Sequence, residues 1–433
     1  MRRWRGLKAL IHDAIDRTTD LVEEGHESVS RSVMGVLGAI EPIAEPARLV
    51  DGARRLTTRC VLGTNRAVNR GVEVVTDVAL DAAEHATRMK LGEGALEPTA
   101  VPMRSDVLET GAWLADAAMG LVNGAIGDHL HARGNGLDLG MSFRAGSGYV
   151  ALEREALARA LPAAGSRVAL FVHGLGTTEW SWCLEGLAYH GDAGASFGSL
   201  LEKDLGYTPI YLRYNTGRHV SENGRDLARA LERLVAEYPV VIDELLLIGH
   251  SMGGLVLRSA SHYADLEGLA WPSTVKRVFC LGSPHHGAPL ERLGHLAAAV
   301  LGAIDTPGTR IPARILQGRS AGIKDLRHGF LVDDDWIGQD LDALREPGTR
   351  EIPLLDHVAY HFVSATVTDD PNHPVGRLIG DLLVQVPSAH GTRCHHAKFP
   401  IDVRHHGGVL HHQLQNHPAV YAQLRAALAT ESS

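Results

Sequence analysis

From about residue 165 onward, short runs of apolar and β-branched residues alternate with longer stretches of helical periodicity. Continuous apolar strands separated by helices are typical of a parallel sheet that is covered on both faces. The pattern therefore predicts a doubly wound α/β domain. Strands are expected at 167–172, 208–213, 244–248, 275–281, 358–367 and 400–404, and helices near 221–238, 253–265 and 416–429.

The chain has a different character before this point. From about residue 5 to 130, apolar residues recur at helical spacing, with a last helical stretch at about 106–130 and little strand pattern. Glycines then gather at 134–148, which indicates a loop or a short hairpin. We therefore expect an N-terminal helical region over residues 1–150 and an α/β domain over residues 151–433.

Residues 290–350 lie between two expected strands and exceed the length of a plain connection. Long insertions of this kind often cover a binding cleft. Apolar residues such as Leu296 and Val300 are mixed with polar turns in this stretch. We expect a lid-like insertion, with a solvent-facing excursion as the alternative.

Composition and charge argue against several classes of protein. The 433 residues include 42 Lys and Arg against 51 Asp and Glu, for a net charge of −9, which argues against a general nucleic-acid binder. The four cysteines are far apart and form no CxxC pair, so neither a disulfide framework nor a thiolate zinc site is expected. We expect free thiols in a reducing compartment.

The N-terminus begins with basic residues, as a signal peptide does. Asp13, Asp16 and Asp20 interrupt the apolar run that would have to follow, and no stretch approaches the roughly 20 apolar residues of a membrane span. We therefore expect a soluble, cytoplasmic protein. The N-terminal helices are expected to pack on the α/β domain. They could instead mediate oligomers, or lie on a membrane or lipid surface, as the basic residues beside Trp4 suggest.

The sequence GHSMGG at 249–254 follows the expected strand that ends at Ile248 and precedes a helical stretch. Strand, sharp turn and helix form the setting of the G-x-S-x-G nucleophile elbow. Its glycines let the backbone bend, and the N-terminus of the helix favours developing negative charge. The pattern predicts Ser251 as a nucleophile; the alternative is a glycine-rich turn with an incidental serine.

A serine hydroxyl is a weak nucleophile and needs a base, which in this arrangement comes late in the chain. The loop between the strand at 400–404 and the helix from about 416 contains His411 and His412, and both are candidates. The remaining late histidines, expected on the surface or in packing, are His395, His396, His405, His406 and His417. We expect no metal site, because these histidines lack the carboxylate spacing of a known ligand set.

An acid is needed to hold the imidazole tautomer and to stabilise the imidazolium. It should follow the strand at 358–367, where Asp369, Asp370 and Asp381 qualify. Asp381 is favoured because it stands between apolar anchors, whereas the other two precede Pro371 and resemble turn residues.

An oxyanion hole is the third requirement. One donor should be the backbone N–H of Met252, which follows the serine. The other should come from the loop after the strand at 167–172, where HGLG at 173–176 makes the Leu175 N–H the natural choice. We expect His173 and Gly174 to border the substrate, and Trp180 to form an apolar wall; core packing is the alternative for Trp180.

Together these pieces resemble the α/β-hydrolase superfamily on its lipase and esterase side, and within it the bacterial GPI inositol-deacylase-like hydrolases. The resemblance covers about 165–430. The matching segments are FVHGLG at 171–176, YLRYNTGRHVSENG at 211–224, GHSMGG at 249–254, LGSPHHGAP at 281–289, GDLLVQVPSA at 380–389 and HHQLQNHPAVY at 411–421. The family's acid motif usually reads GDGLV, so Leu382 stands where a glycine is usual, and His412 is an extra histidine in the base motif.

The resemblance implies Ser251 as nucleophile, Asp381 as acid and His411 as base. It implies a serine hydrolase that cleaves carboxylic esters, lipid-like or of medium chain length, through an acyl-enzyme and without metal or organic cofactor. An acyltransferase or thioesterase with the same three residues is one alternative. A non-catalytic lipid-binding protein is the other.

Overall fold

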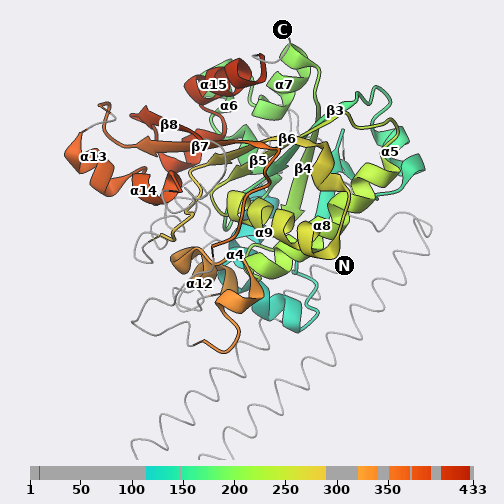
Figure 1. Cartoon of the computed structure of the whole chain (residues 1–433), viewed down its shortest axis with the longest axis horizontal. Coiled ribbons are helices and arrows are strands. Elements are labelled where there is room, and N and C mark those ends of the chain that lie inside the picture. Colours follow the sequence, from blue (N-terminus) through green and yellow to red (C-terminus); the bar gives the residue numbers. More distant parts are fainter. Residues whose placement is uncertain are drawn as a thin grey trace, which may run out of the picture. The chain divides into compact units, whose positions relative to one another are not determined.

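The computed structural model describes residues 114–146, 148–288, 320–339, 351–370, 373–391 and 401–429, and the single residue Ala9. The helices expected before residue 114 and most of the 290–350 insertion, including Leu296 and Val300, lie outside these residues. The chain divides into two units, Met1–Pro98 with Gly134–Leu137, and Thr99–Arg133 with Asp138–Ser433. The fold and the site below belong to the second unit (Figure 1).

An eight-stranded sheet forms the centre of this unit, in the order β2-β1-β4-β3-β5-β6-β7-β8. The strands from β4 to β8 pair in parallel, whereas β1 pairs antiparallel with both β2 and β4. Their bounds are β1 Met141–Ala145, β2 Gly148–Val150, β3 Arg167–Val172, β4 Thr208–Tyr214, β5 Glu244–His250, β6 Val275–Leu281, β7 Ala359–Thr366 and β8 Asp402–Gly407.

Helices cover both faces of the sheet, as the apolar strands require. The α-helices are α4 Leu114–Ala132, α5 Arg154–Ala160, α6 Gly186–His190, α7 Phe197–Leu205, α8 Val220–Glu237, α9 Met252–Glu267, α12 Ala321–His328, α13 Pro374–Ile379, α14 Val386–Ala389 and α15 Pro418–Ala429. Four 3₁₀ turns complete the described elements: η1 Glu179–Cys183, η2 Trp271–Thr274, η3 Asp333–Asp335 and η5 His411–Gln415.

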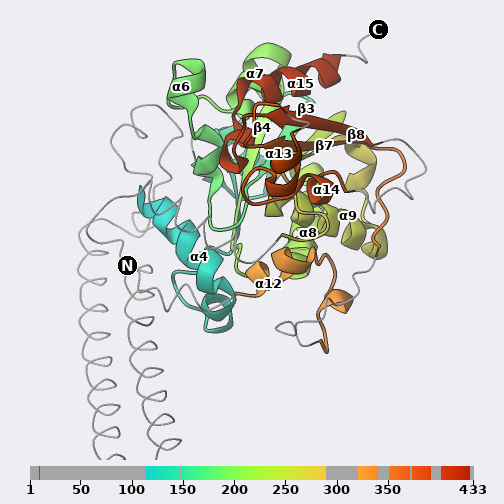
Figure 2. The ribbon, with the colours of Figure 1, turned by 90° about the vertical axis from the view of Figure 1, so that its left-hand side faces the viewer.

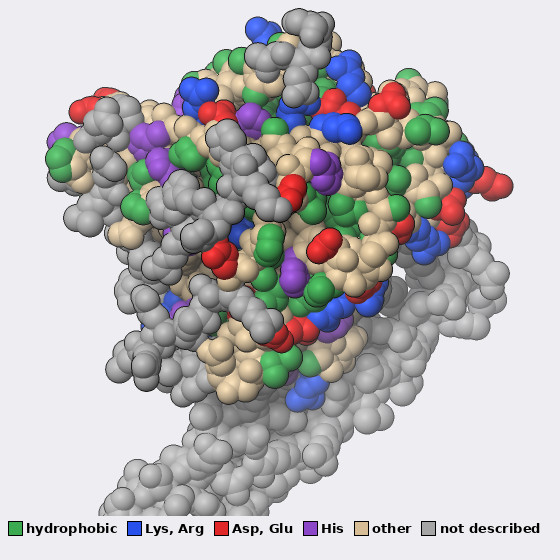
Figure 3. Space-filling view, viewed as in Figure 1, with side chains coloured by type: hydrophobic (Ala, Val, Ile, Leu, Met, Phe, Trp, Pro, Cys, Tyr) green, Lys and Arg blue, Asp and Glu red, His purple; other side chains and the backbone are tan. Residues whose placement is uncertain are grey.

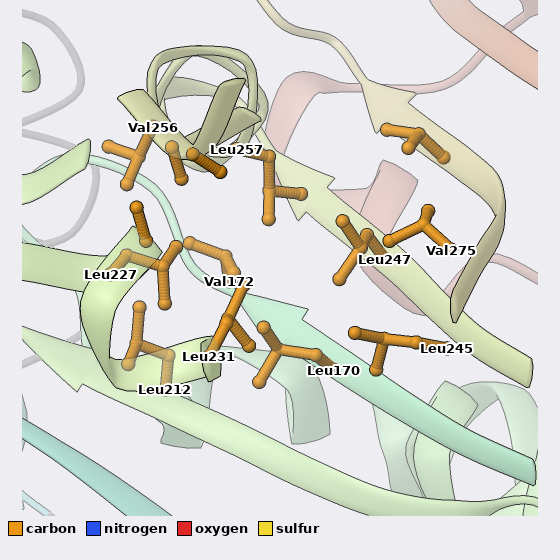
Figure 4. Close-up of a cluster of buried hydrophobic side chains, with 14 of the residues drawn as sticks. Leu170, Val172, Leu212, Leu227, Leu231, Leu245, Leu247, Val256, Leu257 and Val275 are labelled. Carbon is orange, nitrogen blue, oxygen red and sulfur yellow. The ribbon is translucent and has the colours of Figure 1, made fainter. Parts of the chain in front are cut away.

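Alternating residues of the central strand β3 divide the core into two layers, because successive side chains of a strand point to opposite faces. Leu170 and Val172 pack with residues of α8 and α9 (Figure 4). Ala169 and Phe171 pack with residues of α7 and α15 on the other face. Figure 2 shows these two helix pairs on opposite sides of the sheet. The doubly wound α/β prediction is therefore confirmed.

The expected strands and helices of the α/β part all appear, with bounds that differ by a few residues. Helix α4 confirms the end of the helix expected at 106–130, and the glycine-rich stretch forms the hairpin of β1 and β2. That hairpin joins the sheet through β4, although it lies before residue 150. The division of the chain at residue 150 stays a prediction.

The surface of the described residues carries charges of both signs. On the face in Figure 3, acidic and basic side chains are interspersed. None of the described helices is long and apolar enough to cross a membrane. Among the described residues, Cys183 and Cys280 are buried and form no disulfide, whereas Cys60 and Cys394 lie outside the described residues.

Candidate active site

Ser251 occupies the turn between β5 and α9 in a conformation that is rare for a residue with a side chain. Its φ is +54° and its ψ is −123°. Such positive-φ conformations cost on the order of 1–3 kcal/mol and occur where the surrounding structure enforces them. The Ser251 amide donates to the Leu281 carbonyl at 2.8 Å, which ties the turn to the end of β6. Its side chain makes no capping hydrogen bond to α9.

The glycines of GHSMGG are required by close backbone approaches. A Cβ on Gly253 would overlap the Val172 carbonyl oxygen at the end of β3, and one on Gly254 would overlap the side chain of Ser283. A Cβ on Gly249 would meet the backbone of Gly254 itself. The turn is therefore fixed by packing of the backbone against neighbouring segments.

The HGLG loop after β3 lies directly against this turn. A Cβ on Gly174 would stand 3.0 Å from the Cβ of Ser251. In the part of the chain that the structure describes, the backbone amides of Leu175 and Met252 donate no hydrogen bond to another segment. Two backbone N–H donors are thus available close to Ser251, and an oxyanion hole is built from such donors.

Asp381 and His411 form a buried pair. The Nδ1–H of His411 donates to Oδ2 of Asp381 at 2.8 Å, and both side chains are at most 3% exposed. The backbone amide of His411 also donates to the Asp381 carbonyl at 3.2 Å. The other carboxylate oxygen accepts the amides of Leu383 and Val384 at 3.0 and 2.8 Å. The carboxylate therefore has a fixed orientation, and Nε2 of His411 is left as an acceptor.

The pair contacts the segments that hold Ser251. The His411 ring lies against Gly282, where a Cβ would be 3.1 Å from its Cε1, and Gly282 follows the residue that accepts the Ser251 amide. The Nε2–H of His250 donates to the His411 carbonyl at 3.0 Å, and the two rings are 4.8 Å apart. Nε2 of His411 is buried without a hydrogen-bond partner among the described residues.

The rival residues lie in other surroundings. His412 is 41% exposed in its side chain, with its Nε2 3.9 Å from Oε1 of Glu185; burial, followed by the charge of His411, lowers its pKa. Asp369 and Asp370 are exposed. Of the candidates, the structure brings Asp381 and His411 together.

Two further histidines next to Ser251 are held neutral. Burial lowers the pKa of His173 to about 4. Burial, reinforced by the charge of His411, lowers the pKa of His250 well below its usual range. The described residues contain no group of three His, Cys, Asp or Glu side chains that could hold a metal ion.

Two residues expected to border the substrate have structural partners. The ring of His173 is buried and stacks on Tyr214 with centroids 4.5 Å apart. Trp180 is also buried; its indole N–H donates to Asp116 at 3.2 Å, and the guanidinium of Arg144 lies over its ring. Contact of these side chains with a substrate stays a prediction.

Sequence reasoning missed a buried ion cluster beyond the HGLG loop. Glu179 is fully buried and accepts from Arg213 at 2.7 and 2.8 Å, from Arg144 at 3.2 Å and from Tyr149 at 2.7 Å. Burial alone would raise the pKa of Glu179, but the charge of Arg213 and these hydrogen bonds hold it below its usual value. The segment YLRYNTGRHVSENG, noted without a role, contains Arg213.

The described residues have the α/β-hydrolase fold. A serine at a strand–turn–helix bend, followed in chain order by an aspartate and a histidine on a mostly parallel sheet, is the arrangement of that superfamily. Residues 167–336 match the family model described as a PGAP1-like alpha/beta domain. The resemblance expected from the sequence is thus confirmed at this level.

Several solved structures are similar to this chain. The mature form of the Bacillus licheniformis lipase BlEst2 has 17% identity over 60% of this chain and 91% of that chain, with a TM-score of 0.38. The RedJ thioesterase from the prodiginine pathway of Streptomyces coelicolor has 18% identity over 62% and 92%, with a TM-score of 0.36. Mouse alpha/beta hydrolase domain-containing protein 10 has 13% identity over 62% and 90%, with a TM-score of 0.35. No curated protein matches the chain.

Proposed function

We propose that this chain is a serine hydrolase that cleaves carboxylic esters through an acyl-enzyme. Ser251 is the nucleophile, His411 the general base and Asp381 the residue that orients His411. The amides of Leu175 and Met252 bind the oxyanion. The substrates are lipid-like or medium-chain acyl esters, as the resemblance to lipases and esterases implies.

One observation carries the proposal: a buried Asp–His pair lies against the segments that hold a strained serine, and its Nε2 has no hydrogen-bond partner among the described residues. An unpaired buried nitrogen costs free energy, and structures retain such groups mainly where they have a task. Because Nδ1 of His411 donates to Asp381, the lone pair for accepting a proton is on Nε2.

The reaction follows from these positions. As the Ser251 oxygen attacks the acyl carbonyl, its proton moves to Nε2 of His411. The carbonyl oxygen becomes an oxyanion between the two amides, and each such donor is worth about 3 kcal/mol in related enzymes. When the tetrahedral intermediate collapses, the ester C–O bond breaks and His411 returns the proton to the leaving alcohol. Water then attacks the acyl-enzyme with His411 again as base, which releases the acid and frees Ser251.

The experiment compares the full chain with Ser251→Ala on p-nitrophenyl esters of increasing acyl length. We expect hydrolysis by the full chain and a loss of at least about 10⁴-fold in the variant, because a triad acts as a unit. A fluorophosphonate probe should label the full chain and fail to label the variant. Equal rates in both proteins would reject the proposal, and acyl transfer to competing alcohols in place of water would reassign the acceptor.

A further inference from the structure

The end of strand β4 and the residues after it contact the HGLG loop at its first residue. The hydroxyl of Tyr214 donates to the His173 carbonyl at 2.8 Å. The Tyr214 amide donates to Nε2 of His173 at 3.4 Å, and the two rings stack. Because Nδ1–H of His173 donates to the Gly174 carbonyl at 3.0 Å, both ring nitrogens have partners and the neutral ring fits this place.

A second contact holds the last residue of the same loop. The amide of Gly176 donates to the hydroxyl oxygen of Thr216 at 3.0 Å, and Thr216 is 1% exposed. Helix α4 packs against the loop, since a Cβ on Gly124 would stand 2.7 Å from Cα of Gly176. The loop has little room to move at this point.

A third contact lies three residues after the end of the loop. Glu179 is held by Arg213, the residue immediately before Tyr214 in β4. Three positions within four residues, Arg213, Tyr214 and Thr216, thus fix Glu179, His173 and Gly176 respectively. Between the two fixed loop positions lie Gly174 and Leu175, and the Leu175 amide donates no backbone hydrogen bond within the described residues.

We propose that Tyr214 and Thr216 are positioning residues that aim the Leu175 amide at the oxyanion. The inference rests on the proposed function and deepens it. The Nδ1–H of His173 and the hydroxyl of Thr177 donate to the Gly174 carbonyl, which shares a peptide unit with the Leu175 N–H. Tyr214 holds His173 in place, and Thr216 holds the next peptide unit at Gly176. The direction of the Leu175 N–H is thus set before substrate arrives. A donor that is aimed in advance stabilises the charge that develops in the transition state, so losing its aim lowers kcat more than it raises KM.

The test replaces the hydroxyl of Thr216 without changing the volume of its side chain. Thr216→Val should lower kcat about 10- to 100-fold, less than loss of a complete oxyanion donor, and leave KM within about threefold. Thr216→Ser keeps the acceptor oxygen and should restore most of the rate. Thr274→Val is the matched control, because the Thr274 hydroxyl bonds the Trp271 carbonyl in η2, and it should keep the full rate.

A second readout separates positioning from general loosening of the fold. The inhibition constant of a trifluoromethyl ketone, which forms an oxyanion on Ser251, should rise by the same factor as kcat falls. Tyr214→Phe should show the same pattern and serves if Thr216→Val does not fold. An unchanged kcat in both folded variants, with an active wild type, would overturn the inference alone. A wild type that neither hydrolyses esters nor labels at Ser251 would overturn the proposed function instead.

Discussion

The two halves of the candidate site are built by different forces. The nucleophile side, which comprises the turn at 249–254 and the loop at 173–176, is fixed by backbone packing at its glycines and by the end of β4. The acid–base side, which comprises 380–384 and 411–415, is fixed by hydrogen bonds between two loops thirty residues apart. The first half depends mainly on close backbone packing at its glycines, whereas the second depends on specific hydrogen-bond partners.

This difference explains why one half of the site is easier to predict from the sequence than the other. Close contacts at Gly249, Gly253 and Gly254 exclude residues with a side chain, so the turn can be recognised as a sequence motif. A hydrogen-bonded pair allows more residue types at the neighbouring positions. In the acid motif, for example, Leu382 stands where a glycine is usual. The two halves can be tested separately, and substitutions in the acid–base side should have the greatest effect.

The largest effect is expected on the acid–base side. His411→Ala should lower kcat/KM on the order of 10⁴-fold or more, because the base and its proton relay are removed, and Asp381→Asn about 10⁴-fold, because the tautomer of His411 is no longer fixed. His412→Ala is the matched control and should change the rate by less than about threefold. Steady-state kinetics on a p-nitrophenyl ester measures all three. A reversal, with the base lost in the His412 variant, would move the proton acceptor to the neighbouring residue.

On the nucleophile side we expect a stability effect that depends on pH. The pKa of His173 falls from 6.5 to about 4 on folding because the ring is buried, so the unfolded chain binds this proton more tightly than the folded one. The contribution of His173 to the free energy of unfolding is complete above pH 6.5 and is lost as the pH falls toward 4. At about 1.4 kcal/mol per pKa unit, this loss is about 3 kcal/mol.

Urea unfolding of His173→Gln between pH 7 and 4 measures this effect. The variant should lose less of its free energy of unfolding over this range than the wild type. Some pH dependence should persist, since burial also lowers the pKa of His250 and His285. Replacing the exposed His357 by Gln is the control. Parallel curves for wild type and His173→Gln would contradict the buried neutral ring.

The smallest effect is expected at Leu382, beside the acid. Its φ is +86°, in the left-handed region that favours glycine, and its side chain is about half exposed. Leu382→Gly should relieve strain of roughly 1–2 kcal/mol. This is opposed by about 0.5–1 kcal/mol, because glycine raises the backbone entropy of the unfolded chain. A net gain of about 0.5–1 kcal/mol in the free energy of unfolding should follow, with ester hydrolysis unchanged. A destabilised variant would show that the Leu382 side chain packs more tightly than its exposure indicates.

Much of the fold could be predicted because its strands and helices follow from residue patterns within short segments. The apolar runs of β3 to β7 and the amphipathic α8 follow from periodicity, and the late candidates for acid and base were narrowed to a few residues by chain order. The choice between Asp369, Asp370 and Asp381 could not be settled by spacing alone, because it depends on which carboxylate meets His411 in space.

The rest of the site depends on contacts between distant segments, which single-sequence patterns do not encode. His173 and Trp180 read as substrate contacts because they stand in or near the HGLG loop, and their partners Tyr214 and Asp116 lie 41 and 64 residues away. The cluster around Glu179 joins residues from β1, β2 and β4, and no spacing rule pairs Glu179 with two arginines. A glutamate three residues after a glycine loop, with arginines in flanking strands, is the pattern to search for in similar chains.

The cluster around Glu179 also bears on how the chain can be shortened without losing its activity. Arg144 and Tyr149, which satisfy this buried carboxylate, come before residue 151, as does Asp116, which pairs with Arg213. A protease cut or an alternative start that removed them would leave this buried carboxylate, three residues beyond Gly176, with two of its four hydrogen bonds, both from Arg213. We expect such a truncation to abolish the proposed hydrolysis, although Ser251, Asp381 and His411 would remain in the polypeptide.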